Sequence, residues 1–283
     1  MTALLLSACG GSGRAGGGLD VVAAENVYGD IASQIGGPRV SVTSILTSPN
    51  ADTHLFEPGT SNSLAVAGAK VVLQNGLGYD AFMTKLEDAA PSGGRAIVTM
   101  ADVLGVHGRD ANPHLWYDVP RLGRIAGAIT AAFERADPRH AAGYRAGLSR
   151  FDRSLAPLRR EVAATRARFH GVPVAYTEPV PEYLVTAAGL RNLAPGSFTR
   201  SIQDGSEPSP SGVSAMDELI AKHRIKALLY NAQAVSPITA RLRDAARRAG
   251  IPVVPVRETL PAGQTFQQWQ LAQARALAAA LAR

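Results

Sequence analysis

The sequence predicts an α/β protein with two lobes, each a mostly parallel sheet flanked by helices, joined by one long helix. Short apolar runs rich in β-branched residues alternate with segments of helical periodicity, which is typical of parallel sheets covered by helices. The alternation stops at residue 137, gives way to one long amphipathic pattern, and resumes at residue 170. A chain of 283 residues, 46% of them hydrophobic, is large enough for two such lobes. We therefore expect lobes at 19–136 and 170–283 and a linking helix at 137–169.

The first half of the chain alternates predicted strands and helices. A helix follows the first strand because Val27, Ile31 and Ile35 recur every four residues, and Gly36-Gly37-Pro38 ends it. Strands are expected at 19–24, 40–46, 70–73 and 96–100, and helices at 26–36, 61–67, 79–89 and 119–135. In parallel sheets of this kind, ligands bind in the loops beyond the carboxyl ends of the strands.

The linking helix is predicted from its cap and its apolar spacing. Asp137 is the expected N-cap, and Pro138 suits the first helical position. Apolar side chains then recur in steps of three and four, at Tyr144, Leu148, Phe151, Leu155, Leu158 and Val162. A helix running to about residue 168 would be roughly 45 Å long. Pro157 lies inside it and lacks a backbone donor, so we expect a kink there.

The second half repeats the architecture of the first without repeating its sequence. Strands are expected at 172–176, 227–230 and 251–256, and helices at 211–223, 236–249 and 266–282. Ser211 or Ser214 is the expected cap of the first of these helices, because a hydroxyl can accept a hydrogen bond from a free backbone N–H.

The amino terminus contains the single cysteine, Cys9, so no intramolecular disulfide is possible. The preceding Leu4-Leu5-Leu6-Ser7-Ala8 makes this stretch similar to the lipobox of bacterial lipoproteins, in which the cysteine is acylated after cleavage. The apolar run is too short to span a bilayer and lacks a positive n-region, so we expect the true signal to begin upstream. Residues 10–18 are glycine-rich and would form a flexible tether. A chance Leu-Ser-Ala-Cys sequence is the alternative.

The charge distribution argues against a nucleic-acid partner. The chain has 29 Lys and Arg against 23 Asp and Glu, a formal charge of +6. The excess is spread along predicted helices, without a basic run and without interleaved aromatic residues. We interpret it as solvated helix faces.

Two histidines lie in loops that are dense in proline, asparagine and aspartate. His54 follows a predicted strand, and His114 lies within Asn112-Pro113-His114-Leu115-Trp116-Tyr117-Asp118. Imidazole is the commonest transition-metal ligand in proteins, and binding residues concentrate in loops. Asp118 is either an acceptor for the second N–H of the His114 ring or the N-cap of the helix that follows. Trp116 and Tyr117 are expected to pack as wall residues.

Two carboxylates stand just beyond apolar strands in the second half, Glu178 after 172–176 and Glu258 after 251–256. Two imidazoles and two carboxylates suit a divalent first-row metal, because nitrogen ligands favour Zn²⁺ and other late metals whereas oxygen ligands favour Mn²⁺. Their negative charge would nearly cancel that of the ion. For each carboxylate, an ion pair with an arginine is the simpler alternative.

The chain as a whole resembles the cluster A-I substrate-binding proteins of metal ABC transporters, the zinc and manganese receptors, over roughly residues 19–283. The resemblance rests on Ile35-Gly36-Gly37 with Val40-Ser41-Val42, Asp52-Thr53-His54 with Glu57-Pro58, Ala69-Lys70-Val71-Val72 with Asn75-Gly76, Asn112-Pro113-His114 with Trp116 and Asp118, and Thr177-Glu178 with Tyr183. It implies two α/β lobes joined by a rigid helix, with the metal in the cleft between them.

The resemblance also implies the ligands, the partners and the location. His54 and His114 would be the ligands from the first lobe, and Glu178 and Glu258 those from the second. The protein would be a monomer anchored through lipidated Cys9 outside the cytoplasmic membrane. It would deliver Zn²⁺ or Mn²⁺ to an ABC permease and need no cofactor besides this substrate ion.

Two features depart from the family pattern. The fourth ligand is commonly aspartate, whereas this chain has Glu258, whose side chain is one methylene longer. Many zinc receptors also carry a long loop rich in histidine and acidic residues. Residues 80–110 of this chain have a single histidine, His107, and no such run. The second departure weakens a zinc-scavenging interpretation, although zinc remains compatible with the ligand set.

Two other functions are weighed against the metal receptor. A binding protein of the same architecture for an organic ligand or siderophore would require that the four candidates do not converge. A metal-dependent hydrolase would need an open coordination position and a nearby base, and the chain has no His-Glu-x-x-His motif and no phosphate-binding glycine loop. We therefore expect no enzymatic activity.

Overall fold

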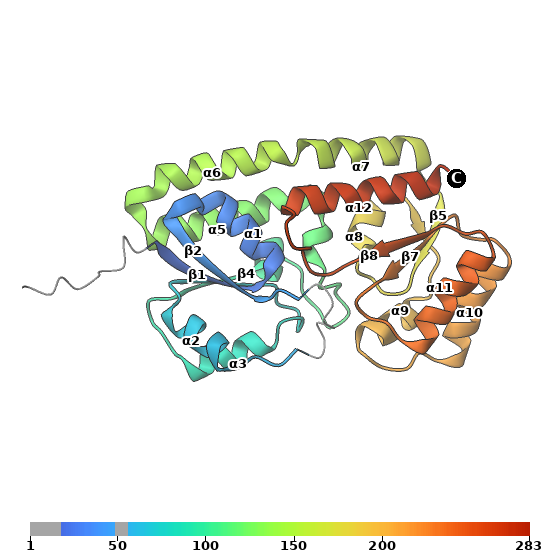
Figure 1. Ribbon diagram of the computed structural model, residues 1–283, viewed down its shortest axis with the longest axis horizontal. Helices are drawn as coiled ribbons and strands as arrows, with labels where there is room; N and C mark the ends of the chain where they lie inside the picture. Colours follow the sequence, from blue (N-terminus) through green and yellow to red (C-terminus); the bar gives the residue numbers. More distant parts are fainter. Residues whose placement is uncertain (1–17, 49–55) are drawn as a thin grey trace, which may run out of the picture.

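The computed structural model describes residues 18–48 and 56–283 and contains two four-stranded parallel sheets (Figure 1). The predicted fold class is confirmed. The first sheet has the order β2-β1-β3-β4, with strands Leu19–Glu25 (β1), Val40–Leu46 (β2), Val71–Gln74 (β3) and Ala96–Thr99 (β4). The second has the order β6-β5-β7-β8, with strands Pro173–Tyr176 (β5), Arg191–Asn192 (β6), Leu228–Asn231 (β7) and Val253–Val256 (β8).

Helices cover both faces of the first sheet. Their bounds are Asn26–Gly36 (α1), Thr60–Gly68 (α2), Phe82–Ala89 (α3), Met100–Leu104 (α4) and Leu122–Ala136 (α5). One face of the central strand β1 packs with α1 and α5, and the other packs with α2 and α3. Val21 and Val22, neighbours in β1, lie in these two different cores because successive side chains of a strand point to opposite faces. This explains why residues 21–24 of β1 are all apolar.

The second sheet is covered in the same way. Its helices are Glu182–Ala187 (α8), Gly196–Gln203 (α9), Pro210–Ala221 (α10), Pro237–Arg248 (α11) and Phe266–Leu281 (α12). The sequence did not indicate β6, α8 or α9, which are short. The cap of α10 was also predicted wrongly: the hydroxyl of Ser209, rather than Ser211 or Ser214, accepts from the backbone N–H of Gly212. Pro210 occupies the first turn, where a missing N–H costs nothing.

The link between the sheets is two helices instead of one. A 3₁₀ turn at Pro138–His140 leads into Ala141–Ser154 (α6), and Ala156–Phe169 (α7) follows after Leu155. The expected kink at Pro157 is therefore wrong in detail, because Pro157 lies in the first turn of α7, after the break. Asp137 turns its carboxylate to the hydroxyl of Tyr144 at 2.9 Å and makes no hydrogen bond to the helix backbone.

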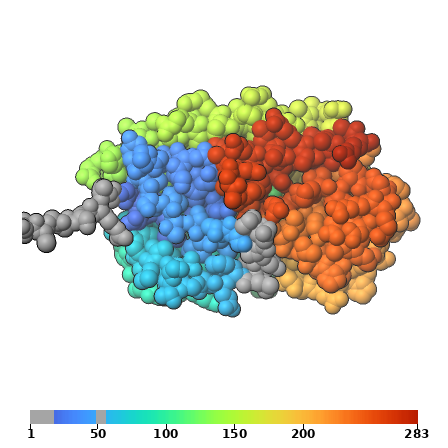
Figure 2. Space-filling model, viewed as in Figure 1, coloured from blue at the N-terminus to red at the C-terminus, as the bar shows by residue number. Residues whose placement is uncertain are grey.

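The helix α12 forms a second connection between the two lobes. It packs along α7, and its amino-terminal end reaches α1 of the first lobe. The backbone N–H of Phe266 donates to Asp30 at 2.8 Å, and Gln267 and Gln34 exchange amide hydrogen bonds. In the space-filling view α12, in red, abuts the blue first lobe (Figure 2).

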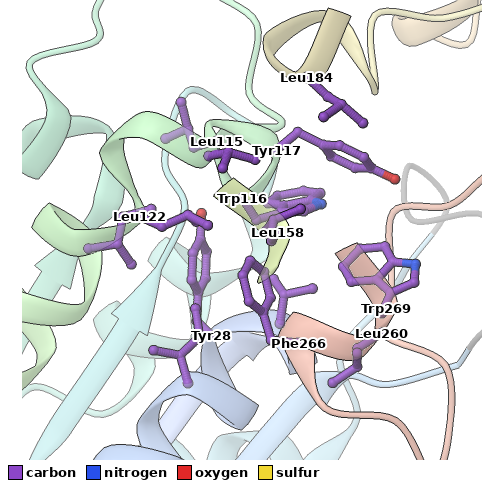
Figure 3. Packing of buried hydrophobic residues seen from close by; sticks show 14 of the residues in the cluster. Tyr28, Leu115, Trp116, Tyr117, Leu122, Leu158, Leu184, Leu260, Phe266 and Trp269 are labelled. Atoms are coloured by element: carbon purple, nitrogen blue, oxygen red, sulfur yellow. The ribbon is translucent and has the colours of Figure 1, made fainter. Parts of the chain in front are cut away.

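One apolar core runs from the first lobe into the second. Tyr28 of α1, Trp116, Leu158 of α7, Leu184 of α8 and Phe266 of α12 belong to the same cluster (Figure 3). The core and α12 together hold the two sheets in a fixed relation. Within the described parts of the chain, no helix has both the length and the apolar character needed to cross a bilayer.

Candidate metal centre

Three of the four predicted ligands lie together between the two sheets. One ligand atom from each of His114, Glu178 and Glu258 falls within 4.8 Å of the others. The Nε2 atom of His114 is 3.9 Å from Oε1 of Glu178 and 3.5 Å from Oε2 of Glu258. All three side chains are buried. Such a buried group of one imidazole and two carboxylates has the donor atoms and the spacing of a transition-metal site.

The parallel sheets explain why the two carboxylates meet. Glu178 follows β5 by two residues and Glu258 follows β8 by two residues, so both leave the same edge of the second sheet. The strand β7 lies between them. His114 reaches them from the first half of the chain, just before a 3₁₀ turn at Leu115–Tyr117. The site is thus built at the carboxyl ends of parallel strands, where such folds bind ligands.

The His114 ring is oriented by Asn112 rather than by Asp118. The Nδ1 atom of His114 lies 2.7 Å from Oδ1 of Asn112, which also accepts from the His114 backbone N–H at 3.0 Å. The Asn112 amide donates to the carbonyl of Pro179 at 2.7 Å and to Glu182 at 2.9 Å. Because Nδ1 donates to an oxygen acceptor, Nε2 is the ring nitrogen that carries the lone pair.

Asp118, expected as either the partner of His114 or a helix cap, has a different role. Its carboxylate pairs with the guanidinium of Arg121, which lies one turn further along the chain. It makes no hydrogen bond to the backbone of the helical turn that follows. The 3₁₀ turn at Leu115–Tyr117 separates the side chains of His114 and Asp118. Asn112, two residues before His114, contacts the ring instead.

The lone pair of His114 has no hydrogen-bond donor among the described residues. Its Nε2 is buried and makes no hydrogen bond within residues 18–48 and 56–283. A buried nitrogen acceptor without a donor is costly unless something else satisfies it. Two buried carboxylates beside it add a negative charge that a divalent cation would neutralise. The site therefore fits a metal ion on both counts.

Aromatic side chains wall the site, as expected for Trp116 and Tyr117. Trp116 is fully buried and meets the rings of His114 and Tyr79 edge-on at 5.5 Å and 5.1 Å. The Tyr117 hydroxyl donates to the carbonyl of Arg257 at 2.7 Å, and burial raises the pKa of Tyr117. Tyr79 extends from the first lobe and donates to Oε2 of Glu258 at 2.8 Å. The Glu258 carboxylate is therefore held from both lobes.

A cavity of about 760 Å³ adjoins the site between the lobes. It is lined by residues of the first lobe, including Tyr79, Lys85 and Pro113, and by Gln203 and Asp204 of the second. Tyr79 lines this cavity and also donates to Glu258, so this one side chain stands between the cavity and the site.

Some predicted residues are not described, and some important ones were missed. His54 and Cys9 lie outside the described residues.

Sequence reasoning missed Asn231, whose amide contacts both carboxylates. A signal for it existed, because Asn231 ends the apolar run 227–230 just as the two glutamates follow theirs. Asn112 was noticed within its motif, but nothing local showed that its side chain faces the ring.

A second carboxyl pair is buried deeper in the first lobe. Glu25, the last residue of β1, is 1% exposed, and Asp80 is 4% exposed. Asp80 accepts hydrogen bonds from the backbone N–H groups of Asn75 and Gly76 at 2.5 Å and 2.9 Å. Burial, and secondly the nearby charge of Asp80, raises the pKa of Glu25 well above 4.5. Glu25 therefore favours its neutral form in the folded protein.

This pair predicts a pH-dependent gain in stability for Glu25→Gln. Below the ordinary pKa of glutamate both the folded and the unfolded states hold the proton, so the variant and the parent should be equally stable. Above it the unfolded state loses the proton first, and the parent loses up to about 1.4 kcal/mol of unfolding free energy per pH unit. The glutamine cannot ionise, so the variant should become the more stable protein as pH rises. Urea denaturation between pH 4 and about pH 8 measures this.

The control for this prediction is Glu207→Gln, in which an exposed loop carboxylate is neutralised. The free energy of unfolding of Glu207→Gln should depend on pH as that of the parent does. A Glu25→Gln protein whose stability runs parallel to that of the parent at every pH would show that Glu25 is ionised in the fold.

Curated relatives of the chain include metal-binding lipoproteins. Over 158 residues the chain is 29% identical to the manganese-binding lipoprotein MntA of Bacillus subtilis, a match that covers 51% of this chain and 50% of that protein. The chain thus spans about half the length of this curated relative.

Two solved structures share the fold over nearly the whole length. The periplasmic zinc-binding protein TroA of Treponema pallidum superposes with a TM-score of 0.76 at 20% identity, covering 94% of this chain and 100% of that one. The binding protein FpvC of Pseudomonas aeruginosa in complex with Mn²⁺ gives a TM-score of 0.78 at 17% identity, covering 94% and 99%. Residues 21–280 also match the family model described as zinc-uptake complex component A, periplasmic. Since that model spans both sheets and the helices that join them, the chain belongs to the periplasmic zinc-uptake component A family.

Proposed function

We propose that this protein captures a divalent transition-metal ion, Zn²⁺ or Mn²⁺, between its two lobes and delivers it to an ABC permease. The observation that carries the proposal is the buried convergence of His114, Glu178 and Glu258 within 4.8 Å. The imidazole comes from the first lobe and the carboxylates from the second. An ion bound there would join the lobes, and a small separation of them would weaken every bond at once.

We propose His54 as the fourth ligand. The sequence places it in a loop after β2, and the described residue before that loop supports the assignment. The carbonyl of Ser48 accepts from the hydroxyl of Thr259 at 3.2 Å. Ser48, the last described residue before the loop, therefore lies beside Thr259, the residue that follows Glu258. Two imidazoles and two carboxylates would then complete a four-ligand set.

The ligand set and the fold favour transport over catalysis. Four protein ligands leave no position for a reactive water, whereas catalytic zinc sites keep one open. The family is one of transport components, and relatives are named as metal-binding lipoproteins. We therefore propose a binding protein without enzymatic activity or cofactor. An organic ligand is not favoured, because the three described donors face one another at the spacing of a single ion.

We further propose the location and the organisation that the sequence suggests. Acylation of Cys9 would anchor a monomer outside the cytoplasmic membrane, and residues 10–18 would tether it. The ion-binding body would comprise lobes 19–136 and 170–283 with the linking segment 137–169. The relatives named as lipoproteins support an extracytoplasmic, membrane-associated location.

The test is the metal stoichiometry of the purified chain, followed by competitive titration against a chelator. We expect one equivalent of Zn²⁺ or Mn²⁺, with Zn²⁺ binding more tightly in vitro, as the Irving–Williams order requires. Binding should release protons and weaken in acid, because protons compete with the metal for imidazole and carboxylate. A chain that takes up neither ion stoichiometrically would contradict the proposal and favour an organic ligand.

A further inference from the structure

Asn231 stands between the two carboxylates of the candidate site. It is the last residue of β7, the strand between β5 and β8, and its side chain is 1% exposed. Its backbone N–H donates to the hydroxyl of Thr177 at 3.1 Å, which fixes the end of the strand against the residue before Glu178. The side chain is therefore held at the position from which it can reach both glutamates.

The orientation of the Asn231 amide is set by its neighbours. Its Oδ1 accepts from the backbone N–H of Gln233 at 3.0 Å, so the oxygen faces away from the carboxylates. Gln233 is itself held, because its Oε1 accepts from the backbone N–H of Glu258 at 2.7 Å. The NH₂ group of Asn231 consequently points into the site with both of its hydrogens.

These two hydrogens reach one oxygen of each glutamate. The Nδ2 atom donates to Oε2 of Glu178 at 2.5 Å and to Oε1 of Glu258 at 2.7 Å. The other oxygen of each carboxylate is the one nearest to Nε2 of His114, at 3.9 Å for Glu178 and 3.5 Å for Glu258. The amide thus holds one oxygen of each carboxylate, and the other oxygen of each is the one that faces His114.

We infer that Asn231 is a specificity-determining positioning residue, which holds Glu178 and Glu258 as single-oxygen ligands and so favours Zn²⁺ over Mn²⁺. Carboxylates that each give one oxygen keep the number of donors small, as in the four-coordinate sites that Zn²⁺ prefers. Mn²⁺ prefers more oxygens, which two carboxylates could supply by binding through both of their oxygens. This inference rests on the proposed function and assigns the ion within it.

The test is Asn231→Leu in the full chain, because leucine has a similar volume and no donor. Both affinities should fall by about 10- to 100-fold, the range for a partner that orients a ligand. The loss should be larger for Zn²⁺, since freed carboxylates can offer Mn²⁺ their second oxygens. We expect the ratio of the Zn²⁺ and Mn²⁺ affinities to drop by about tenfold. X-ray absorption should show more oxygen ligands to Mn²⁺ in the variant than in the parent.

The matched control is Asn192→Leu. Asn192 lies at the end of β6, also in the second lobe, and its amide oxygen accepts from the backbone of Ala194, away from the carboxylates. The ratio of the Zn²⁺ and Mn²⁺ affinities of Asn192→Leu should equal that of the parent.

Three results would overturn the inference. A parent that binds neither ion removes the proposed function and the inference with it. If the parent binds one equivalent of metal and Asn231→Leu loses equal affinity for Zn²⁺ and for Mn²⁺, only the inference is removed. Asn231 would then stabilise the site without distinguishing the two ions. An unchanged number of oxygen ligands to Mn²⁺ in the variant would likewise remove only the inference.

Discussion

Replacement of His114 by alanine is expected to lower the affinity for Zn²⁺ by about 100- to 1000-fold. A four-ligand zinc site contributes roughly 10–16 kcal/mol in total, so one ligand accounts for about 2.5–4 kcal/mol, which corresponds to this loss. His114 should reach the upper part of the range, because it is the imidazole that faces both carboxylates. Its loss would leave Glu178 and Glu258 close together with one partner fewer. Competitive titration against a chromogenic chelator measures the change.

The control for His114 is His170→Ala. His170 is exposed just beyond the end of α7, so its loss should leave the affinity for Zn²⁺ unchanged. If His114→Ala retained the affinity of the parent while His170→Ala weakened it, the metal would lie elsewhere and the buried cluster would be structural.

Replacement of Trp116 by alanine should affect both stability and binding. Trp116 is fully buried, and its ring lies 6.1 Å from that of Tyr28 (Figure 3). The ring of His114 lies 5.5 Å away. Removing such a side chain leaves a cavity that typically costs about 3–5 kcal/mol of unfolding free energy. The His114 ring would also lose the wall that fixes its position, so the Zn²⁺ affinity should fall by about 10-fold. Urea denaturation gives the first quantity and chelator competition the second.

Phe198→Ala separates these two effects. Phe198 is fully buried in a different core, between the second sheet and α9 to α11, and it has no part in the wall of the site. It should lose a similar amount of stability and keep the affinity of the parent. Equal losses of affinity in the two variants would mean that Trp116 acts only through global stability.

The sequence predicted the fold because its signals are local. A short apolar run with β-branched residues, such as Val21 and Val22 in β1, predicts a strand before anything is known of what packs on it. The same logic pointed to Glu178 and Glu258, since a residue just beyond a parallel strand lies at the binding edge of its sheet. The structure brings both of them to His114. That they bind a metal remains a prediction.

The details that only packing decides were missed or wrong. The linking segment breaks at Leu155 instead of bending at Pro157, because a proline is accommodated without cost in the first turn of a new helix. Asp118 was a candidate partner for His114 by proximity in sequence, yet it pairs with Arg121. The apolar spacing of α12 predicted a helix but could not show that its end would bond to α1.

The sequence by itself therefore determined the class of fold, the alternation of strands and helices, and three polar side chains that the structure brings together. Periodicity and turn residues act over a few positions, and that range suffices for these features. Tertiary structure alone decided which asparagine orients His114, that Asn231 spans both carboxylates, that Tyr79 reaches Glu258 across the lobes, and that Glu25 lies buried beside Asp80. Each of these depends on how the sheets and their helices pack against one another, because contacts with residues distant in sequence fix these side chains and leave no periodic signal in the chain.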